Sequence, residues 1–231
     1  MLAPAAALLF LAVPDPLAAL GPVPAGTVRV YLIRHGQALS NLEPPPSAAP
    51  HGLDHLTPLG EAQARKVGEI LAGHGVKLVL TSPAGRAKES AEQIAAALGA
   101  APTRVEARLR PLELGTDASG KPLSWDDRGK EFAAGRDPVP AGGESMAQVG
   151  ERVMALVKGL RAEAPAASVA LVAHGEVIAA LVGEIQGTPP AMRYPPRLAN
   201  GSITVVEARP DGSVAVLVAN HVPPGMPSPA P

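Results

Sequence analysis

The stretch Val28-Arg-Val-Tyr-Leu-Ile-Arg34-His35-Gly36 decides the fold and shows where to look for a functional site. Val28 to Ile33 is short, rich in β-branched residues and bounded by turn-forming residues, which predicts a buried β-strand. This strand runs directly into Arg34, His35 and Gly36. An apolar strand that ends in a cation and an imidazole is typical of a sheet whose carboxyl edge binds a ligand.

The sequence around this strand alternates between helical and strand-like patterns. Thr57 and Ser82 are each followed by a proline, which is the pattern of a helix cap with a first-turn proline. Ser145 and Gln148 have the spacing of a capping box before another helix. Further strands are predicted at Val76 to Thr81, Ser168 to Ala173, Ser202 to Glu207 and Val214 to Val218, and a helix from Val177 to Ile185. This alternation predicts an α/β fold: a single-domain three-layer sandwich, with a mostly parallel sheet and helices on both faces.

Length and composition fit one globular domain. The 231 residues are 46% apolar and 18% charged, enough for a sizeable hydrophobic core. A formal net charge of −1 gives no electrostatic case for binding nucleic acid or an anionic membrane. The absence of cysteine excludes disulfides, thiolate metal sites and cysteine nucleophiles.

The two ends of the chain differ in composition from the rest. Residues 1–25 are predicted to be a leader segment, 26–222 the domain and 223–231 a disordered Pro-rich tail. The apolar run from Ala5 to Val13 is too short to span a bilayer and resembles the apolar part of a secretory signal. That pattern predicts export to the periplasm. The first cation of the chain is Arg29, however, so a cytoplasmic protein with an Ala/Pro-rich leader remains the alternative. The oligomeric state is not readable from the sequence.

Basic residues follow two more of the predicted strands. Arg86 lies in the first turn of the helix after the second strand, and His174 directly follows a later one. Because the carboxyl ends of parallel strands meet at one edge of a sheet, we expect both residues to converge with Arg34 and His35 on one anion-sized hollow.

These residue types favour phosphoryl transfer. Arginine guanidinium groups bind phosphate oxygens in a bidentate manner, and the helix N-terminus at Arg86 adds backbone donors. A neutral imidazole can attack phosphorus, which predicts His35 as a covalent nucleophile, while His174 donates to the phosphoryl oxygens. A single Arg-His-Gly or His-Gly occurs readily by chance, so the prediction depends on the whole set.

Motifs along the chain resemble those of the histidine phosphatase superfamily, also called phosphoglycerate mutase-like. They are Leu32-Ile-Arg-His-Gly-Gln37, Leu56-Thr-Pro-Leu-Gly-Glu61, Thr81-Ser-Pro-Ala-Gly-Arg86, Gly142-Gly-Glu-Ser145, Val172-Ala-His-Gly175 and Asn200-Gly-Ser-Ile203. The resemblance implies His35 as phosphoryl acceptor and a small phosphorylated molecule as substrate. It also implies a phosphate pocket of Arg34, Arg86 and His174, with Asn41 assisting, and no metal or organic cofactor.

The family's general acid is where the match breaks. Relatives carry a glutamate in a Leu-x-Glu element, but here that position is Pro111, in Leu109-Arg-Pro-Leu-Glu113. In an extended segment, residues two apart face the same side, so Glu113 is the candidate acid. Glu144 is the other carboxylate that could lie near the pocket, and a solvated Glu113 with no acid at all is the alternative.

Two further groups of residues lie in segments that could border the pocket. His51 and His55, with Asp54 in the same loop, are four residues apart, a spacing typical of metal ligands on a helix, but the neighbouring Pro50 and Gly52 argue against a helix. A loop beside the substrate, with no metal, is the better interpretation. Trp125 lies in a segment that could cap the pocket, and an anchor in the core is equally compatible.

Three functions follow from this set. The first is an acid-phosphatase-type hydrolase for phosphoric monoesters, working through phosphohistidine on His35. The second is a phosphoglycerate mutase, although mutases carry tryptophan-rich segments after the Arg-His-Gly motif, where this chain has a Pro/Ala-rich loop. The third is a non-catalytic phosphate-binding protein, which the intact basic set argues against and Pro111 mildly favours.

Overall fold

The computed structural model describes residues 15–47, 52–163, 167–194 and 198–228. Within them lies one six-stranded sheet in the order β3-β2-β4-β1-β5-β6. The strands are β1 (Val28–Arg34), β2 (Val76–Thr81), β3 (Thr103–Val105), β4 (Ser168–Ala173), β5 (Ile203–Ala208) and β6 (Val214–His221). The α-helices are α1 (Pro58–Leu71), α2 (Gly85–Ala97), α3 (Trp125–Ala133), α4 (Met146–Glu163) and α5 (Gly175–Gln186).

The sheet is mixed but mostly parallel. β1 pairs in parallel with β4, and β2 pairs in parallel with both β4 and β3. β5 runs antiparallel to its neighbours β1 and β6. The short turn between β5 and β6 explains why these two strands are antiparallel, because two strands joined by so few residues form a hairpin. The predicted α/β sandwich is confirmed, with one antiparallel strand in the sheet.

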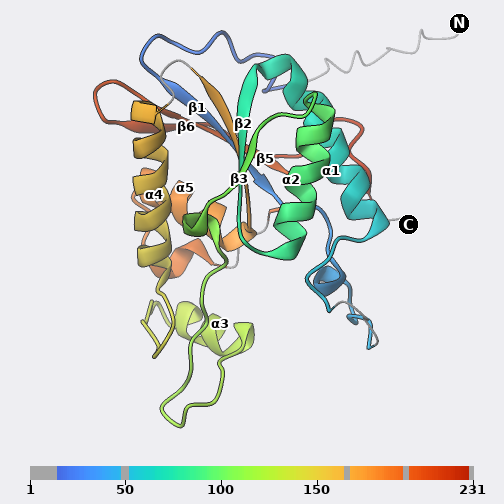
Figure 1. Ribbon diagram of the computed structural model, residues 1–231. Helices are drawn as coiled ribbons and strands as arrows, with labels where there is room; N and C mark the ends of the chain where they lie inside the picture. The colour runs from blue at the N-terminus through green and yellow to red at the C-terminus, as the bar shows by residue number, and fades with distance from the viewer. Residues whose placement is uncertain (1–14, 48–51, 164–166, 195–197, 229–231) are drawn as a thin grey trace, which may run out of the picture.

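Helices cover both faces of the sheet, with α4 and α5 on one side and α1 and α2 on the other (Figure 1). β1 shows how the sequence specifies this arrangement. Its alternate residues Val28, Val30 and Leu32 pack with α4 and α5, and Tyr31 and Ile33 pack with α1 and α2. Because both faces of β1 are buried, its sequence is a nearly continuous run of apolar residues and does not alternate between apolar and polar. No helix in the described ranges is both long and apolar enough to cross a membrane.

Two of the three predicted helix starts are confirmed. The Thr57 hydroxyl accepts a hydrogen bond from the Gly60 N–H at 3.1 Å at the start of α1. Ser145 and Gln148 form the reciprocal capping box, with each side chain accepting from the other residue's N–H at 3.1 and 3.0 Å.

The prediction that Ser82 caps α2 was wrong. The capping position is Ala84, whose side chain makes no cap, and the Asp54 carboxylate instead accepts from the Gly85 N–H at 2.6 Å. A carboxylate from a distant loop therefore satisfies the N-terminus of α2, and the Ser82 hydroxyl bonds to His174.

Gly36 is needed for packing between β1 and α1. A Cβ at Gly36 would lie 2.2 Å from the Gly60 carbonyl oxygen, and a Cβ at Gly60 would lie 2.0 Å from the Gln37 carbonyl oxygen. The glycine after His35 thus brings the backbone close to a neighbouring helix, which fixes His35 relative to α1.

Parts of both terminal segments pack on the domain. Leu17 is buried against the α1–α2 side of the core, and the Arg29 guanidinium donates to the Gly21 carbonyl at 2.6 Å. Met226 packs against the same cluster. Residues 1–14 and 229–231 lie outside the described residues, so the leader and the tail stay predictions.

Candidate active site

A hollow of about 520 Å³ opens at the carboxyl end of the parallel strands. β1, β2 and β4 end there, beside the loop that follows β1 and the segment that carries α3 (Figure 1). Its lining includes Arg34, His35, Asn41, Arg86 and His174. The structure therefore brings together the predicted basic set, because register between parallel strands places their ends side by side.

Hydrogen bonds fix the tautomer of His35. Its Nδ1 lies 2.7 Å from the Gly36 carbonyl oxygen, which can only accept, so Nδ1 carries the proton. The Nε2 atom accepts from the Arg86 Nε–H at 3.1 Å and therefore holds a lone pair. Burial, with Arg86 next in importance, lowers the pKa of His35 to about 3. The ring is therefore neutral at ordinary pH and has the form that a nucleophile needs.

His174 faces His35, with 5.2 Å between the ring centroids. Its Nδ1 lies 3.1 Å from the Arg86 Nη2, which can only donate, so the neutral ring carries its proton on Nε2. That Nε2 lies 2.8 Å from the Ser82 hydroxyl oxygen. Burial and the neighbouring His35 lower the pKa of His174 well below its usual value. A bound phosphate dianion would oppose this shift, because a nearby negative charge favours imidazolium.

Arg86 joins the two imidazoles and is itself held from behind. Its Nη1 pairs with the Asp54 carboxylate, which also accepts from the Gly85 N–H. Burial raises the pKa of Asp54, but the Gly85 N–H and Arg86 outweigh it, so the pKa lies below its usual value. The ionised Asp54 thus orients Arg86, and the prediction that this loop lies beside the substrate pocket fits the position of Asp54. His51 lies outside the described residues.

Arg34 and Asn41 complete the basic end of the pocket. The Arg34 Nη1 donates to the Leu198 carbonyl, while its buried Nε has no hydrogen-bond partner in the described ranges. Asn41 accepts at Oδ1 from the Ala38 N–H at 3.0 Å and from the Asn200 Nδ2 at 3.3 Å. Its Nδ2 is then the group that can donate to an anion. Asn200, which the sequence analysis named only within a family motif and without a role, also donates to the His35 carbonyl at 3.0 Å.

The outer part of the pocket is apolar and aromatic. The residues that line it there are Pro111, Leu112, Leu114, Trp125 and Tyr194. The Trp125 and Tyr194 rings are stacked, with centroids 5.3 Å apart and planes 1° from parallel. Trp125 opens α3 and is 37% exposed, so it lies at the pocket mouth and not in the core.

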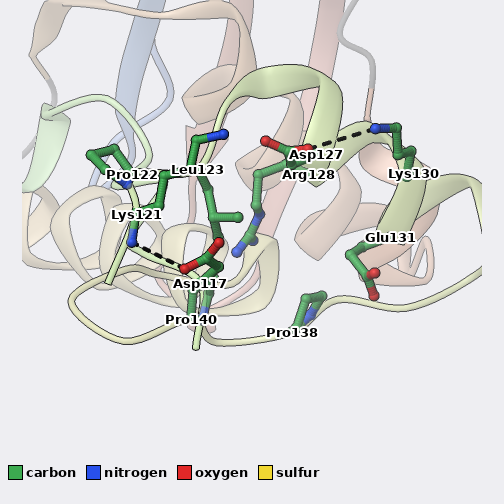
Figure 2. Close-up of a pocket in the computed structure, with 10 residues that line it drawn as sticks. All are labelled: Asp117, Lys121, Pro122, Leu123, Asp127, Arg128, Lys130, Glu131, Pro138 and Pro140. Carbon is green, nitrogen blue, oxygen red and sulfur yellow. Dashed lines mark hydrogen bonds and ion pairs between the residues drawn. The ribbon is translucent and has the colours of Figure 1, made fainter. Parts of the chain in front are cut away.

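A second hollow of about 310 Å³ lies under α3 and is a poorer candidate (Figure 2). Its carboxylates already have partners: Asp127 lies 3.6 Å from the Lys130 ammonium, Asp117 accepts from the Lys121 backbone N–H at 3.0 Å, and Glu131 pairs with Arg136. Its lining contains no histidine, serine or threonine. In the described part of the chain, no cluster of three or more His, Asp or Glu could hold a metal ion.

Comparison with known proteins places this pocket in a family. The sequence profile of the histidine phosphatase superfamily (branch 1) matches residues 30–221. This protein belongs to the histidine phosphatase superfamily. The probable phosphoglycerate mutase GpmB of Salmonella paratyphi B is 33% identical over 188 residues, which cover 78% of this chain and 85% of that protein.

Solved structures agree on the fold. A mycobacterial glucosyl-3-phosphoglycerate phosphatase, solved with VO3, has a TM-score of 0.67 and 29% identity, covering 84% of this chain and 99% of that one. YhfR of Bacillus stearothermophilus has a TM-score of 0.68 and 25% identity, covering 85% of this chain and 98% of that one. One of these similar proteins is named a phosphatase and another a probable mutase, so the similarity assigns the superfamily and not the specific reaction.

The glutamate that lines this pocket is not one of the two that the sequence analysis named. Glu113 does not line the hollow, and its carboxylate pairs with Arg110 at 3.2 Å on the surface. Glu144 does not line it either, because Arg110 and Arg152 hold it elsewhere. Glu176 lines the pocket and was missed. Its place two residues after His174, on the first turn of a helix that starts at a strand end, was the available clue.

Proposed function

We propose that this protein is a phosphatase that hydrolyses phosphomonoesters through a covalent phosphohistidine on His35. The observation that carries the proposal is the state of the His35 ring, since Nδ1 donates to the Gly36 carbonyl and Nε2 holds the lone pair, which accepts from Arg86, a residue of the pocket lining. A neutral, oriented imidazole beside two guanidinium groups is what attack on a phosphoryl group requires.

The proposed reaction has two displacements at phosphorus. In the first, the His35 Nε2 forms a bond to phosphorus and the bond from phosphorus to the leaving oxygen breaks, so that oxygen leaves with its electron pair and takes up a proton. Phosphoryl oxygens replace the imidazoles as acceptors for the Arg86 N–H groups, which frees Nε2, because anionic oxygen is the stronger acceptor. In the second, water forms the new bond to phosphorus, and the bond to Nε2 breaks.

The surrounding donors would stabilise the charge that builds on the phosphoryl oxygens. Arg34, Arg86 and Asn41 line the pocket with N–H groups, and a bound dianion favours protonation of His174, which then donates as well. These donors come from separate elements that are already hydrogen-bonded in place, so little reorganisation is needed during reaction.

The outer wall supports hydrolysis over mutase activity. A phosphoglycerate mutase must hold a carboxylate and a second phosphoryl group, which calls for further cations. Arg34 and Arg86 are the only cationic residues in the described pocket lining, and the outer wall is apolar and aromatic. We therefore propose a substrate whose organic part is uncharged and carries an apolar or ring surface.

The test uses the purified chain with p-nitrophenyl phosphate and no bisphosphoglycerate. We expect release of inorganic phosphate and an acid-labile, base-stable phosphoenzyme after quenching. His35→Ala should lower kcat/KM by about 10⁴-fold or more and abolish the phosphoenzyme, as for loss of a covalent nucleophile. His74→Ala is the matched control, because His74 lies on the α1 side of the sheet against Tyr31, outside the pocket lining.

Three outcomes would contradict the proposal. Full activity or an intact phosphoenzyme in His35→Ala would remove the nucleophile. Strict dependence on bisphosphoglycerate would assign a mutase. Binding of inorganic phosphate or vanadate without turnover of any phosphomonoester would identify a non-catalytic binding protein.

A further inference from the structure

The proposed hydrolysis needs a proton donor that the expected position does not supply. An alkoxide is a poor leaving group, so cleavage of an alkyl phosphate requires a proton on the departing oxygen. Pro111 has no acidic group, and the nearby Glu113 side chain is about half exposed, with Arg110 as its partner. Neither side chain can hold a proton over the pocket.

Glu176 lies where such a donor is needed. It is in the first turn of α5, directly after the His174-Gly175 pair, and is 9% exposed. Its Oε1 accepts from the Leu112 N–H at 3.4 Å. The carboxyl group therefore lies next to the segment that carries Pro111, the position of the usual acid, but it comes from α5.

Burial shifts Glu176 toward the protonated form. It raises the pKa of Glu176, and this outweighs the hydrogen bonds from the Glu176 and Leu112 N–H groups and the charges of Arg86 and Arg34, which all lower it. The Tyr194 phenol interacts with Glu176, and the imidazoles of His35 and His174 line the same pocket. A phosphate dianion bound nearby would raise the pKa further, because like charges disfavour ionisation.

The remaining carboxylates near the pocket are committed to cations. The Glu144 carboxylate accepts hydrogen bonds from Nε and Nη2 of Arg152 at 3.0 and 3.1 Å, and one from Arg110. Asp54 is paired with Arg86 and caps α2. Glu144 is thus held outside the pocket lining, and the contacts of Asp54 lower its pKa and favour its ionised form, which has no proton to give.

We propose that Glu176 is the catalytic proton donor to the leaving group, and that its carboxylate then accepts the proton of the attacking water. The proposal rests on the phosphatase function proposed above. As the bond from phosphorus to the leaving oxygen breaks, the Glu176 proton moves to that oxygen and releases an alcohol. When water attacks the phosphohistidine, its proton returns to Glu176, so each turnover restores the acid. This assignment moves the general acid from the segment before α3 to the first turn of α5.

The test compares Glu176→Gln with Glu113→Gln on two substrates that both carry a phenyl ring. Phenethyl phosphate releases an alcohol, whose alkoxide is a poor leaving group. p-Nitrophenyl phosphate releases a phenol that is much more acidic than the alcohol, so its phenolate leaves without needing a proton. We expect Glu176→Gln to lower kcat/KM for phenethyl phosphate by about 10²- to 10⁴-fold, and for p-nitrophenyl phosphate by less than about 10-fold. Glu113→Gln should leave both values unchanged, because its carboxylate is on the surface.

Two further readouts separate a proton donor from a structural residue. In the wild-type protein, kcat/KM for phenethyl phosphate should fall as pH rises through the raised pKa of Glu176, because the protonated form is active, and this limb should vanish in Glu176→Gln. The variant should also accumulate phosphoenzyme with p-nitrophenyl phosphate, since water lacks its base.

Equal slowing of both substrates by Glu176→Gln, or an unchanged pH limb, would overturn the proposal. Loss of phenethyl phosphate cleavage in Glu113→Gln would return the role to Glu113. These results differ from failure of the proposed function itself, in which the wild-type protein forms no phosphoenzyme with either substrate.

Discussion

The inner and outer ends of the pocket are built by different means. The inner end takes Arg34, His35 and His174 from the carboxyl ends of β1 and β4, and every one of them is hydrogen-bonded. The outer end comes from the segment around α3 and from Tyr194, and its contacts are ring stacking and apolar packing. A rigid sheet edge suits chemistry that depends on exact placement of charge, whereas a surface segment suits variable recognition.

The two glutamates of the pocket region show the same contrast. Glu176 is fixed on a helix that begins at a strand end, and its carboxyl group is buried in the pocket. Glu113 belongs to the connecting segment, and its carboxylate faces solvent. Glu113 was chosen because it lies close in sequence to the family's acid position, but its carboxylate is outside the pocket. The carboxyl group in the pocket belongs to Glu176, at the start of α5.

The largest effect in this comparison is expected for Arg86→Lys at the inner end. Lysine cannot contact both imidazoles and Asp54 at once, and it loses the bidentate grip on phosphate. We expect kcat/KM for p-nitrophenyl phosphate to fall by about 10²- to 10³-fold. Arg108→Lys is the control, since Arg108 pairs with Glu106 outside the pocket. Steady-state kinetics with little change in Arg86→Lys would show that the inner end is not the reactive end.

The Asp54→Asn variant tests whether a residue outside the pocket lining holds Arg86 in place at the inner end. The amide keeps the shape of the carboxylate but loses the charge that holds Arg86 and the N-terminus of α2. A charge-assisted hydrogen bond of about 1.5 kcal/mol corresponds to a fall in kcat/KM of about 10-fold. Asp117→Asn, in the hollow of Figure 2, should leave kcat/KM unchanged. Equal values for the two variants would show that Arg86 needs no partner.

The smallest effect is expected for Trp125→Ala at the outer end. Loss of a ring contact worth about 0.5 to 1.5 kcal/mol should raise KM for phenethyl phosphate by about 3- to 10-fold, with kcat unchanged. KM for ethyl phosphate, which has no ring, should not change. Met192→Ala is the control, because Met192 is exposed and does not line the pocket. A fall in kcat with constant KM would place Trp125 in the chemistry and remove the contrast between the two ends.

Local sequence patterns were enough for most of the secondary structure. The β1 run Val28 to Ile33 and the Ser145–Gln148 box act through neighbours a few residues away, so their conformations follow from short-range sterics and hydrogen bonds. The start of α2 did not follow this rule, because Asp54, about thirty residues earlier, replaced Ser82 as the group that satisfies its N-terminus. Helix α3 has no clear apolar periodicity in the sequence, because it is nine residues long with few apolar positions.

The sequence by itself determined the α/β class, the family and the four basic residues of the pocket, because hydrophobic periodicity places each strand end and the residues that follow it. Tertiary structure alone decided which carboxyl group enters the pocket, which atom of His35 is free to react, and what forms the outer wall. Each of these depends on contacts between residues far apart in the chain: Glu176 with Leu112, His35 with Arg86, and Trp125 with Tyr194. Such contacts are fixed only when the segments pack, because burial and partners then set protonation and orientation.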